Sequence, residues 1–277
     1  ANIPVLKRSE FLDQLISGQR CIAVAGSHGK TTTAAMVAWM LSAMGLDPSY
    51  IIGGVSANLG TNAHAGQGQY FVIEADEYDR MFLGLYPEVA VITNIEHDHP
   101  DCYPTAEEFY QVFAEFSRHV SPGGRLLVCA DDPGGLRLIQ DALARHQSVL
   151  SYGIISSVLA SDVMTPDYQA QNLRLNDQGG YACDVLCILP QGFELNPAFS
   201  LQVPGEYNVR NALAGLSVAH QLGLPLEQAA QALAEFRGTG RRFEVRGEFS
   251  GIVVIDDYAH HPTQILSLIH ISEPTRL

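Results

Sequence analysis

The chain has 277 residues, 47% of them hydrophobic, which is enough to bury the core of one large domain or of two ordinary ones. Its net charge of −14, from 30 acidic and 16 basic residues, argues against a nucleic-acid partner and against an anionic membrane surface. No membrane-spanning run or signal peptide is visible, and the five cysteines lack tight spacing. We therefore expect reduced thiols and a cytoplasmic location.

The first half of the chain alternates between apolar strands and amphipathic helices. The expected helices span residues 7–17, 31–44, 107–120 and 134–146, and the expected strands span residues 21–26, 70–76, 88–95 and 124–132. Strands that are apolar on both faces are typical of a parallel sheet with helices on both sides. The pattern predicts an α/β fold with a mostly parallel sheet of the P-loop NTPase type.

The pattern changes near Ser151. Alternating apolar and polar residues, a Gly-Gly turn and several prolines predict a small antiparallel sheet at the edge of the main sheet. Helices are expected again over residues 206–223 and 225–236. Residues 251–256 predict one more buried strand, which runs into a polar turn.

The segment Ile22–Leu41 contains the tripeptide Gly-Lys-Thr between a buried strand and a helix. In the common phosphate-binding loop, four residues separate the two glycines, but Val24 stands where the first would be. Gly26 and Gly29 still allow backbone N–H groups and a helix N-terminus to point at an anion. The context favours a phosphate loop over an ordinary turn.

Acids and histidines follow two of the expected strands. Glu74 ends one of them, with Asp76, Glu77 and Asp79 behind it, and the next strand is followed by Asn94, His97, Asp98, His99 and Asp101. Carboxyl ends of parallel strands face the same crevice as a phosphate loop, so these groups are candidates for a magnesium site. The His-x-His pattern also occurs in zinc sites, but no cysteine pair or third histidine is placed to complete a tetrahedron.

Three later segments leave their interpretation open. Asn208 and Asn211 share a helix face, where their amides would either read an adenine edge or cap the helix. Arg241 and Arg242 suit phosphate charge, or surface ion pairs. The last group follows another expected strand and consists of Asp256, Asp257, His260 and His261. These residues either form part of a functional site or belong to an ordinary polar loop.

Together these segments resemble the Mur ligase family, whose members join an amino acid or peptide to a nucleotide-sugar carboxylate using ATP. The family's phosphate loop is short and reads G-[TS]-x-G-K-[TS], which corresponds here to Gly26–Thr31. The motifs EADE, TNIEHDHPD, NVRNA, GTGRRF and DDYAHHPT follow in the family's order, and the resemblance covers about residues 1–265.

The resemblance implies a role for each matching position. It places Lys30 and Arg242 on the ATP phosphates, Asn208 and Asn211 on the base, and Asp257 where a further domain closes on ATP. It implies Mg²⁺ ligands at Thr31, Glu74 and His99. The implied catalytic residues are Lys30, Glu74, His99 and Arg242. The implied nucleotide-binding residues also include Gly26, Ser27, His28, Gly29, Thr31 and Thr32.

The resemblance also implies a reaction of peptidoglycan precursor synthesis in the bacterial cytoplasm. The carboxylate of UDP-N-acetylmuramate takes the γ-phosphoryl group to form an acyl phosphate, which the amine of L-alanine then attacks. A recycled murein tripeptide is the alternative amine. A nucleotide-binding module without ligase activity and a folate-adding ligase are further alternatives, and the HHPT motif disfavours the folate enzyme.

From the resemblance we expect residues 1–20 to end a UDP-sugar domain, residues 21–245 to form the central ATP-binding domain, and residues 246–265 to begin a Rossmann-like domain. The final residues 266–277 read unlike the family and are expected to be a non-native tail. On this expectation the chain is a truncated piece that does not catalyse ligation by itself.

Overall fold

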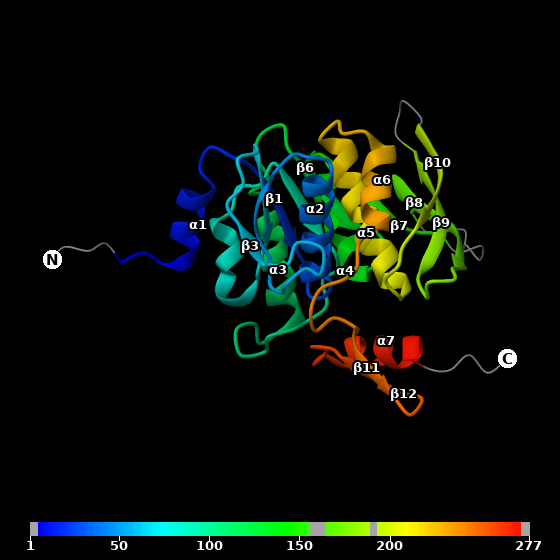
Figure 1. The fold of residues 1–277 in the computed structure, drawn as a ribbon. Helices are drawn as coiled ribbons and strands as arrows, with labels where there is room; N and C mark the ends of the chain where they lie inside the picture. Colours follow the sequence, from blue (N-terminus) through cyan, green and yellow to red (C-terminus); the bar gives the residue numbers. More distant parts are fainter. Residues whose placement is uncertain (1–4, 156–163, 189–192, 273–277) are drawn as a thin grey trace.

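The computed structural model describes residues 5–155, 164–188 and 193–272. Within them, ten strands form one sheet in the order β10-β9-β8-β7-β6-β5-β1-β4-β2-β3 (Figure 1). The strands are β1 (Arg20–Ala25), β2 (Ser49–Ile51), β3 (Ala63–His64), β4 (Tyr70–Glu74), β5 (Val89–Ile92), β6 (Arg125–Cys129), β7 (Val149–Ile154), β8 (Tyr168–Leu175), β9 (Tyr181–Cys187) and β10 (Phe193–Ser200).

The pairing within the sheet confirms the predicted fold class. Strands β2, β4, β1, β5, β6, β7 and β8 pair in parallel. The strands β8, β9 and β10 pair antiparallel at one edge, and they continue the main sheet. Short strands β2, β3 and β7 were not predicted, because two to six residues carry too little periodicity.

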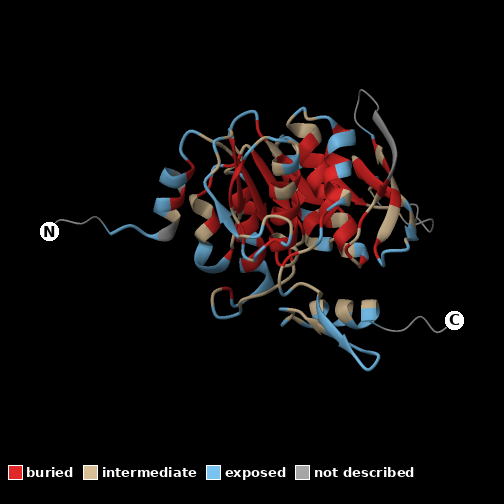
Figure 2. Cartoon of the chain, in the orientation of Figure 1, coloured by how far each residue is buried: buried red, intermediate tan, exposed pale blue. Residues whose placement is uncertain are grey.

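Helices cover both faces of the sheet. The helices α2 (Lys30–Ala43), α5 (Glu206–Gln221) and α6 (Leu226–Ala234) lie on one face, and α1 (Arg8–Ile16), α3 (Ala106–Ser117), α4 (Pro133–Ala144) and the 3₁₀ segment η1 (Tyr78–Gly84) lie on the other. Along β1, Ile22 and Val24 join the first core cluster, whereas Ala23 and Ala25 join the second. This alternation follows from the two-residue period of a strand, and both layers are buried (Figure 2).

The C-terminal segment lies outside these layers. Strands β11 (Glu244–Phe249) and β12 (Ile252–Asp256) form a separate antiparallel ribbon, which is followed by α7 (Pro262–Ser272) (Figure 1). The prediction that the last strand is buried was wrong, since Ile252, Val253 and Val254 are 67%, 51% and 52% exposed. Pairing with β11 satisfies one edge of the β12 backbone, but it covers neither face of the ribbon with a full layer.

Among the described residues, no helix combines the length and the apolar character that crossing a bilayer requires.

Candidate functional site

The turn between β1 and α2 forms an open cradle of backbone. Gly26 and Gly29 have φ of +137° and +84°, in the region that favours glycine, and a side chain at Gly26 would collide with Thr93 Oγ1. Gly29 is the N-cap of α2, and no side chain caps this helix. The first N–H groups of α2 are therefore available to an anion, and the helix dipole favours negative charge there.

Lys30 points back over this loop. Its Nζ donates to Gly26 O at 2.6 Å and forms an ion pair with Glu77 Oε1 at 2.8 Å. Glu77 is fully buried, and its second oxygen, Oε2, has no hydrogen-bond partner among the described residues. Burial alone would raise the pKa of Glu77, but nearby His99 and Lys30 lower the pKa below its usual range. Glu77 is thus an ionised carboxylate held against the loop.

Oxygen ligands gather beside the loop at the end of β4. Thr31 Oγ1 donates to Glu74 Oε1 at 3.1 Å, and Gly53 N donates to Glu74 Oε2 at 2.6 Å. A hydroxyl and a carboxylate at the N-terminus of a helix are the donor set that Mg²⁺ prefers. The residues present therefore fit a magnesium ion and a phosphate group.

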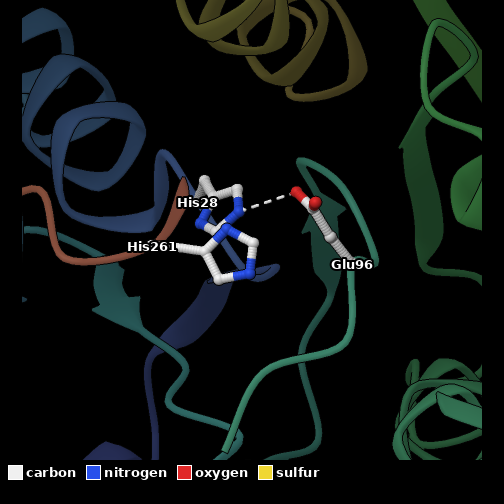
Figure 3. Close-up of side chains that lie close together, drawn as sticks. All are labelled: His28, Glu96 and His261. Atoms are coloured by element: carbon white, nitrogen blue, oxygen red, sulfur yellow. Dashed lines mark hydrogen bonds and ion pairs between the residues drawn. The ribbon is translucent and has the colours of Figure 1, made fainter. Parts of the chain in front are cut away.

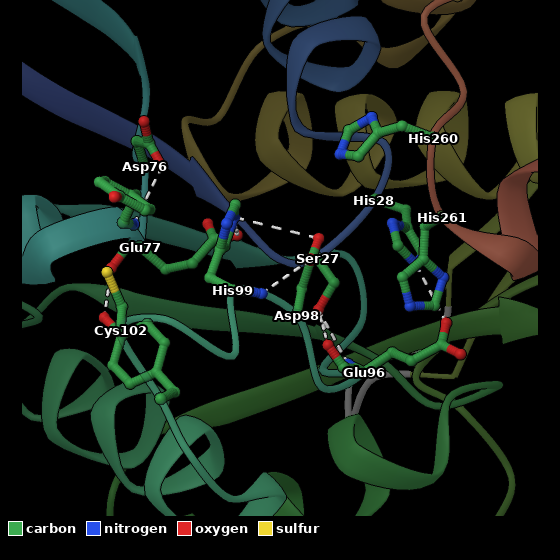
Figure 4. Close-up of polar contacts among 12 residues, drawn as sticks. Ser27, His28, Asp76, Glu77, Glu96, Asp98, His99, Cys102, His260 and His261 are labelled. Carbon is green, nitrogen blue, oxygen red and sulfur yellow. Dashed lines mark hydrogen bonds and ion pairs between the residues drawn. The ribbon is translucent and has the colours of Figure 1, made fainter.

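The two histidines of the His-x-His pattern point to different places. His99 has a φ of +56°, and its Nε2 lies 3.6 Å from Glu77 Oε1, so it faces the loop (Figure 4). The Glu77 carboxylate raises the pKa of His99, against the effect of burial. His97 instead packs against the ring of Phe109, and its Nε2 lies 2.8 Å from the backbone carbonyl oxygen of Tyr103. Only His99 of the pair is placed as a candidate ligand.

A cavity of about 990 Å³ opens beside the loop. Its walls include most of the nucleotide-binding candidates from the sequence, namely His28, Gly29, Thr31, Thr32, Asn208, Asn211, Arg242 and Asp257. A volume of several hundred cubic ångströms is typical of small-molecule sites. The cavity is not lined by Gly26, Ser27 and Lys30 of the loop, nor by Glu74 and His99.

The two asparagines of α5 are buried in the cavity wall. Asn211 Nδ2 donates to Asn208 Oδ1 at 3.2 Å, and Asn208 Nδ2 donates to Pro204 O at 2.7 Å. A side chain at Gly29 would come within 2.9 Å of Asn211 Oδ1, so the loop and α5 are in close contact. The N-cap of α5 is Gly205, with no side-chain cap. Neither asparagine therefore caps α5, and the helix-capping alternative is not observed.

Arg241 and Arg242 lie near the ring of Tyr258, with their guanidinium carbons 5.0 and 5.5 Å from its centroid. Within the described residues, neither arginine forms an ion pair, so the surface ion-pair alternative is not observed. Asp257 accepts hydrogen bonds from Phe243 N and Ala259 N, both at 2.7 Å. It therefore fixes the turn that brings Arg242 to the cavity.

Sequence reasoning missed three contributors to this region. The sequence indicated Glu77 only as one of several acids after a strand. Its partner Lys30 lies 47 positions away, and no periodic pattern in the sequence indicates a contact over that separation. Asp131 and Arg210, which line the cavity, form an ion pair of 2.5 Å between Arg210 Nε and Asp131 Oδ2. Asp131 lies two residues after the end of β6, so the strand-end argument applied to Glu74 would have found it.

Comparison with known proteins identifies the family. Residues 24–219 match the Mur ligase middle domain, and this match covers more than half of the chain. The chain belongs to the Mur ligase family. The loop Gly26–Thr31 lies within the matched residues.

Curated and structural relatives of this chain are named as ligases. A UDP-N-acetylmuramate–L-alanine ligase of Roseiflexus sp. (strain RS-1) is 42% identical over 273 residues, covering 95% of this chain and 56% of the relative. The UDP-N-acetylmuramate–alanine ligase of Thermotoga maritima superposes with a TM-score of 0.75 at 30% identity, covering 94% of this chain and 56% of that one. A murein peptide ligase of Psychrobacter arcticus gives a TM-score of 0.69 at 29% identity, with coverage of 95% and 56%. The chain therefore spans about half the length of the relatives it matches.

Proposed function

We propose that this chain forms the ATP-binding part of a ligase that adds L-alanine to the carboxylate of UDP-N-acetylmuramate. The observation that carries the proposal is the uncapped, glycine-lined loop before α2, which opens beside a cavity of about 990 Å³. Similarity to L-alanine ligases over 95% of the chain supports the choice of substrates.

Each loop residue has a place in this proposal. The backbone N–H groups of Gly29 and of the start of α2 bind phosphate oxygens, because those of Ser27 and His28 already donate to Asn94. Lys30 leaves Glu77 to neutralise phosphate charge. Arg242 reaches the phosphates from the opposite wall. The asparagines Asn208 and Asn211 meet the base from α5.

Thr31, Glu74 and His99 would hold Mg²⁺, which, when bound, offsets the negative charge of the phosphates. The Thr31 hydroxyl and the Glu74 carboxylate are already in contact at 3.1 Å. Glu77 keeps His99 oriented toward the loop, since its oxygen lies 3.6 Å from the ring nitrogen.

The reaction transfers the γ-phosphoryl group of ATP to the muramate carboxylate, which gives an acyl phosphate and ADP. The free amine of L-alanine then attacks the acyl carbon, the amide bond forms, and phosphate leaves with the electron pair of the broken C–O bond. Lys30 and Arg242 stabilise the negative charge that develops during phosphoryl transfer.

We also propose the division of the chain into residues 1–20, 21–245, 246–265 and 266–277, with ATP binding in the second. Residues 266–277 are proposed to be a non-native tail. The genomic sequence of the source organism tests both statements. The proposal requires that the gene encode a Mur ligase in the same reading frame and that its sequence differ from this chain after residue 265.

The test of ATP binding is a titration of the purified chain with Mg-ATP, comparing the wild type with Lys30→Ala. We expect Lys30→Ala to weaken binding at least tenfold, because it removes the cation that faces the phosphates. Lys7→Ala, which changes an exposed lysine far from the loop, is the matched control and should bind like the wild type. Equal affinity of Lys30→Ala and wild type would remove the proposed phosphate site.

The test of the ligase reaction uses the complete protein encoded by the source gene. We expect phosphate release that requires UDP-N-acetylmuramate and L-alanine together. The second candidate, a ligase for L-alanyl-γ-D-glutamyl-meso-diaminopimelate, is favoured by the similar match to the murein peptide ligase. Phosphate release with that tripeptide and not with L-alanine would select the second candidate.

A further inference from the structure

Three side chains from distant parts of the sequence meet at the rim of the cavity: His28 of the loop, Glu96 after β5 and His261 before α7 (Figure 3). The Nε2 atom of His28 lies 3.0 Å from Glu96 Oε2. The rings of His28 and His261 are 4.8 Å apart between centroids. One ligand atom from each residue lies within 4.8 Å of the other two.

The residue types in this cluster select a class of ion. Two imidazoles and one carboxylate suit zinc and other late transition metals, whereas magnesium prefers oxygen ligands and retained waters. Bonds of roughly 2.1 Å in a tetrahedron separate neighbouring ligand atoms by about 3.4 Å. The His28–Glu96 separation of 3.0 Å is close to this value. The His261 ligand atom lies within 4.8 Å of the other two, so it has to move closer to complete the set.

The cluster also has the outer contacts that orient metal ligands. Gln264 Nε2 donates to His28 Nδ1 at 2.8 Å, so the ring proton lies on Nε2 and faces Glu96. Binding a metal ion through Nε2 requires this proton to move to Nδ1 and the Gln264 amide to turn its oxygen toward it. Thr263 Oγ1 donates to Glu96 Oε1 at 2.7 Å, which leaves Oε2 toward His28. A hydrogen bond such as that from Thr263 orients the carboxylate in known metal sites.

We propose that His28, Glu96 and His261 bind one divalent transition-metal ion, of which zinc is the best match. The site differs from the proposed magnesium ligands Thr31, Glu74 and His99, and it does not depend on the proposed ligase reaction. Figure 4 shows His99 on one side of Ser27 and the cluster of His28, Glu96 and His261 on the other. His28 and Glu96 line the cavity, so a water or an anion can take the fourth position.

The proposed ion has a structural consequence. His28 and Glu96 belong to the main body, and His261 belongs to the segment that carries α7. An ion shared by the three residues therefore ties the C-terminal segment to the phosphate loop and adds to the hydrogen bonds of Thr263 and Gln264.

The test is a zinc titration of the tag-free 277-residue chain, without nucleotide or magnesium, in competition with a chromophoric zinc chelator. We expect one zinc per chain, and at least tenfold weaker zinc binding in His261→Ala and in Glu96→Gln. His260→Ala is the matched control, because His260 is the neighbouring histidine and is not in the cluster. It should bind zinc like the wild type.

Cobalt provides a second readout that a merely structural effect would not move. Co²⁺ in place of zinc should give the absorption bands of a low-coordinate cobalt site in the wild type and in His260→Ala, and these bands should be lost in His261→Ala. Circular dichroism and thermal unfolding of each variant confirm that the fold is kept.

Two results would overturn the inference. The first is equal zinc affinity in the wild type, His261→Ala and Glu96→Gln, which would leave a plain hydrogen-bonded pair. The second is zinc binding that is lost in His99→Ala but kept in His261→Ala, which would place the ion beside Glu77 and not in this cluster.

Discussion

Lys30 and Glu77 form an ion pair that is almost closed to water, with side-chain exposures of 13% and 0%. Removing one partner of a buried pair typically costs about 3–5 kcal/mol, because the remaining charge has lost its counter-ion. Lys30 also donates to the carbonyl of Gly26, which lowers this cost. The pair holds the lysine ready beside the loop while no phosphate is bound.

We predict that Glu77→Gln lowers the free energy of unfolding by about 1–3 kcal/mol. It should also tighten ATP binding about three- to tenfold in the presence of EDTA, because Lys30 no longer has to leave a carboxylate to reach the phosphates. Urea denaturation and nucleotide titration measure the two effects. Glu107→Gln, an exposed glutamate paired with Arg137, is the control. Weaker ATP binding in Glu77→Gln would contradict the prediction.

Cysteine reactivity gives a second prediction at the residue scale. Burial raises the pKa values of Cys21, Cys129 and Cys183 to about 12, so at pH 8 about one molecule in ten thousand carries the thiolate. Cys102 is partly exposed. We expect iodoacetamide to modify Cys102 first in the native chain, as mass spectrometry of peptides will measure. A fast reaction that persists in Cys102→Ser would contradict this.

At the scale of elements, Asp132 joins a helix to the edge of the sheet. Its Oδ2 accepts from Gly135 N at 2.7 Å, which caps α4, and from Ile95 N at 2.9 Å, just after β5. The sequence favours this helix start, because Asp132 is followed by Pro133 at the first helical position.

We predict that Asp132→Ala destabilises the chain by about 1.5–3 kcal/mol, since two backbone N–H groups lose their acceptor. Asp132→Asn keeps an acceptor oxygen and should recover most of the loss. Urea denaturation of the three proteins checks the prediction. A loss below about 0.5 kcal/mol in Asp132→Ala would show that water replaces the carboxylate without cost.

The elements differ in how far the sequence could predict them. In β1, Ile22 and Ala23 are both apolar and face opposite layers, so the sequence correctly predicted a strand buried on two sides. The same reasoning failed for Val253 and Val254 in β12, because an apolar run says nothing about whether other layers cover it. At the site, local motifs placed the loop and Glu74, whereas the partners of Lys30 and His28 required the folded chain.

The whole molecule combines a sheet that is buried on both faces with a C-terminal ribbon that is not. The ribbon and α7 expose many of their apolar side chains, and α7 contains no buried residue. Regions with few buried apolar contacts contribute little to global stability and open most easily. The described C-terminal segment is therefore placed to line the cavity more than to stabilise the core.

We predict that a chain ending at Phe243 keeps its fold and loses less than about 3 kcal/mol of unfolding free energy, because it loses a few polar bonds of about 1 kcal/mol each. A chain beginning at Gly18 is the comparison, since it loses Leu12 and Ile16, which are 7% exposed and pack in the core under α1. Each of these side chains contributes about 1.5–3 kcal/mol when buried, so the N-terminal deletion should be the more destabilising one. Urea denaturation followed by tyrosine and tryptophan fluorescence measures both. A larger loss of unfolding free energy for the C-terminal deletion would contradict the prediction. It would mean that the ribbon unfolds together with the core, although many of its apolar side chains are exposed.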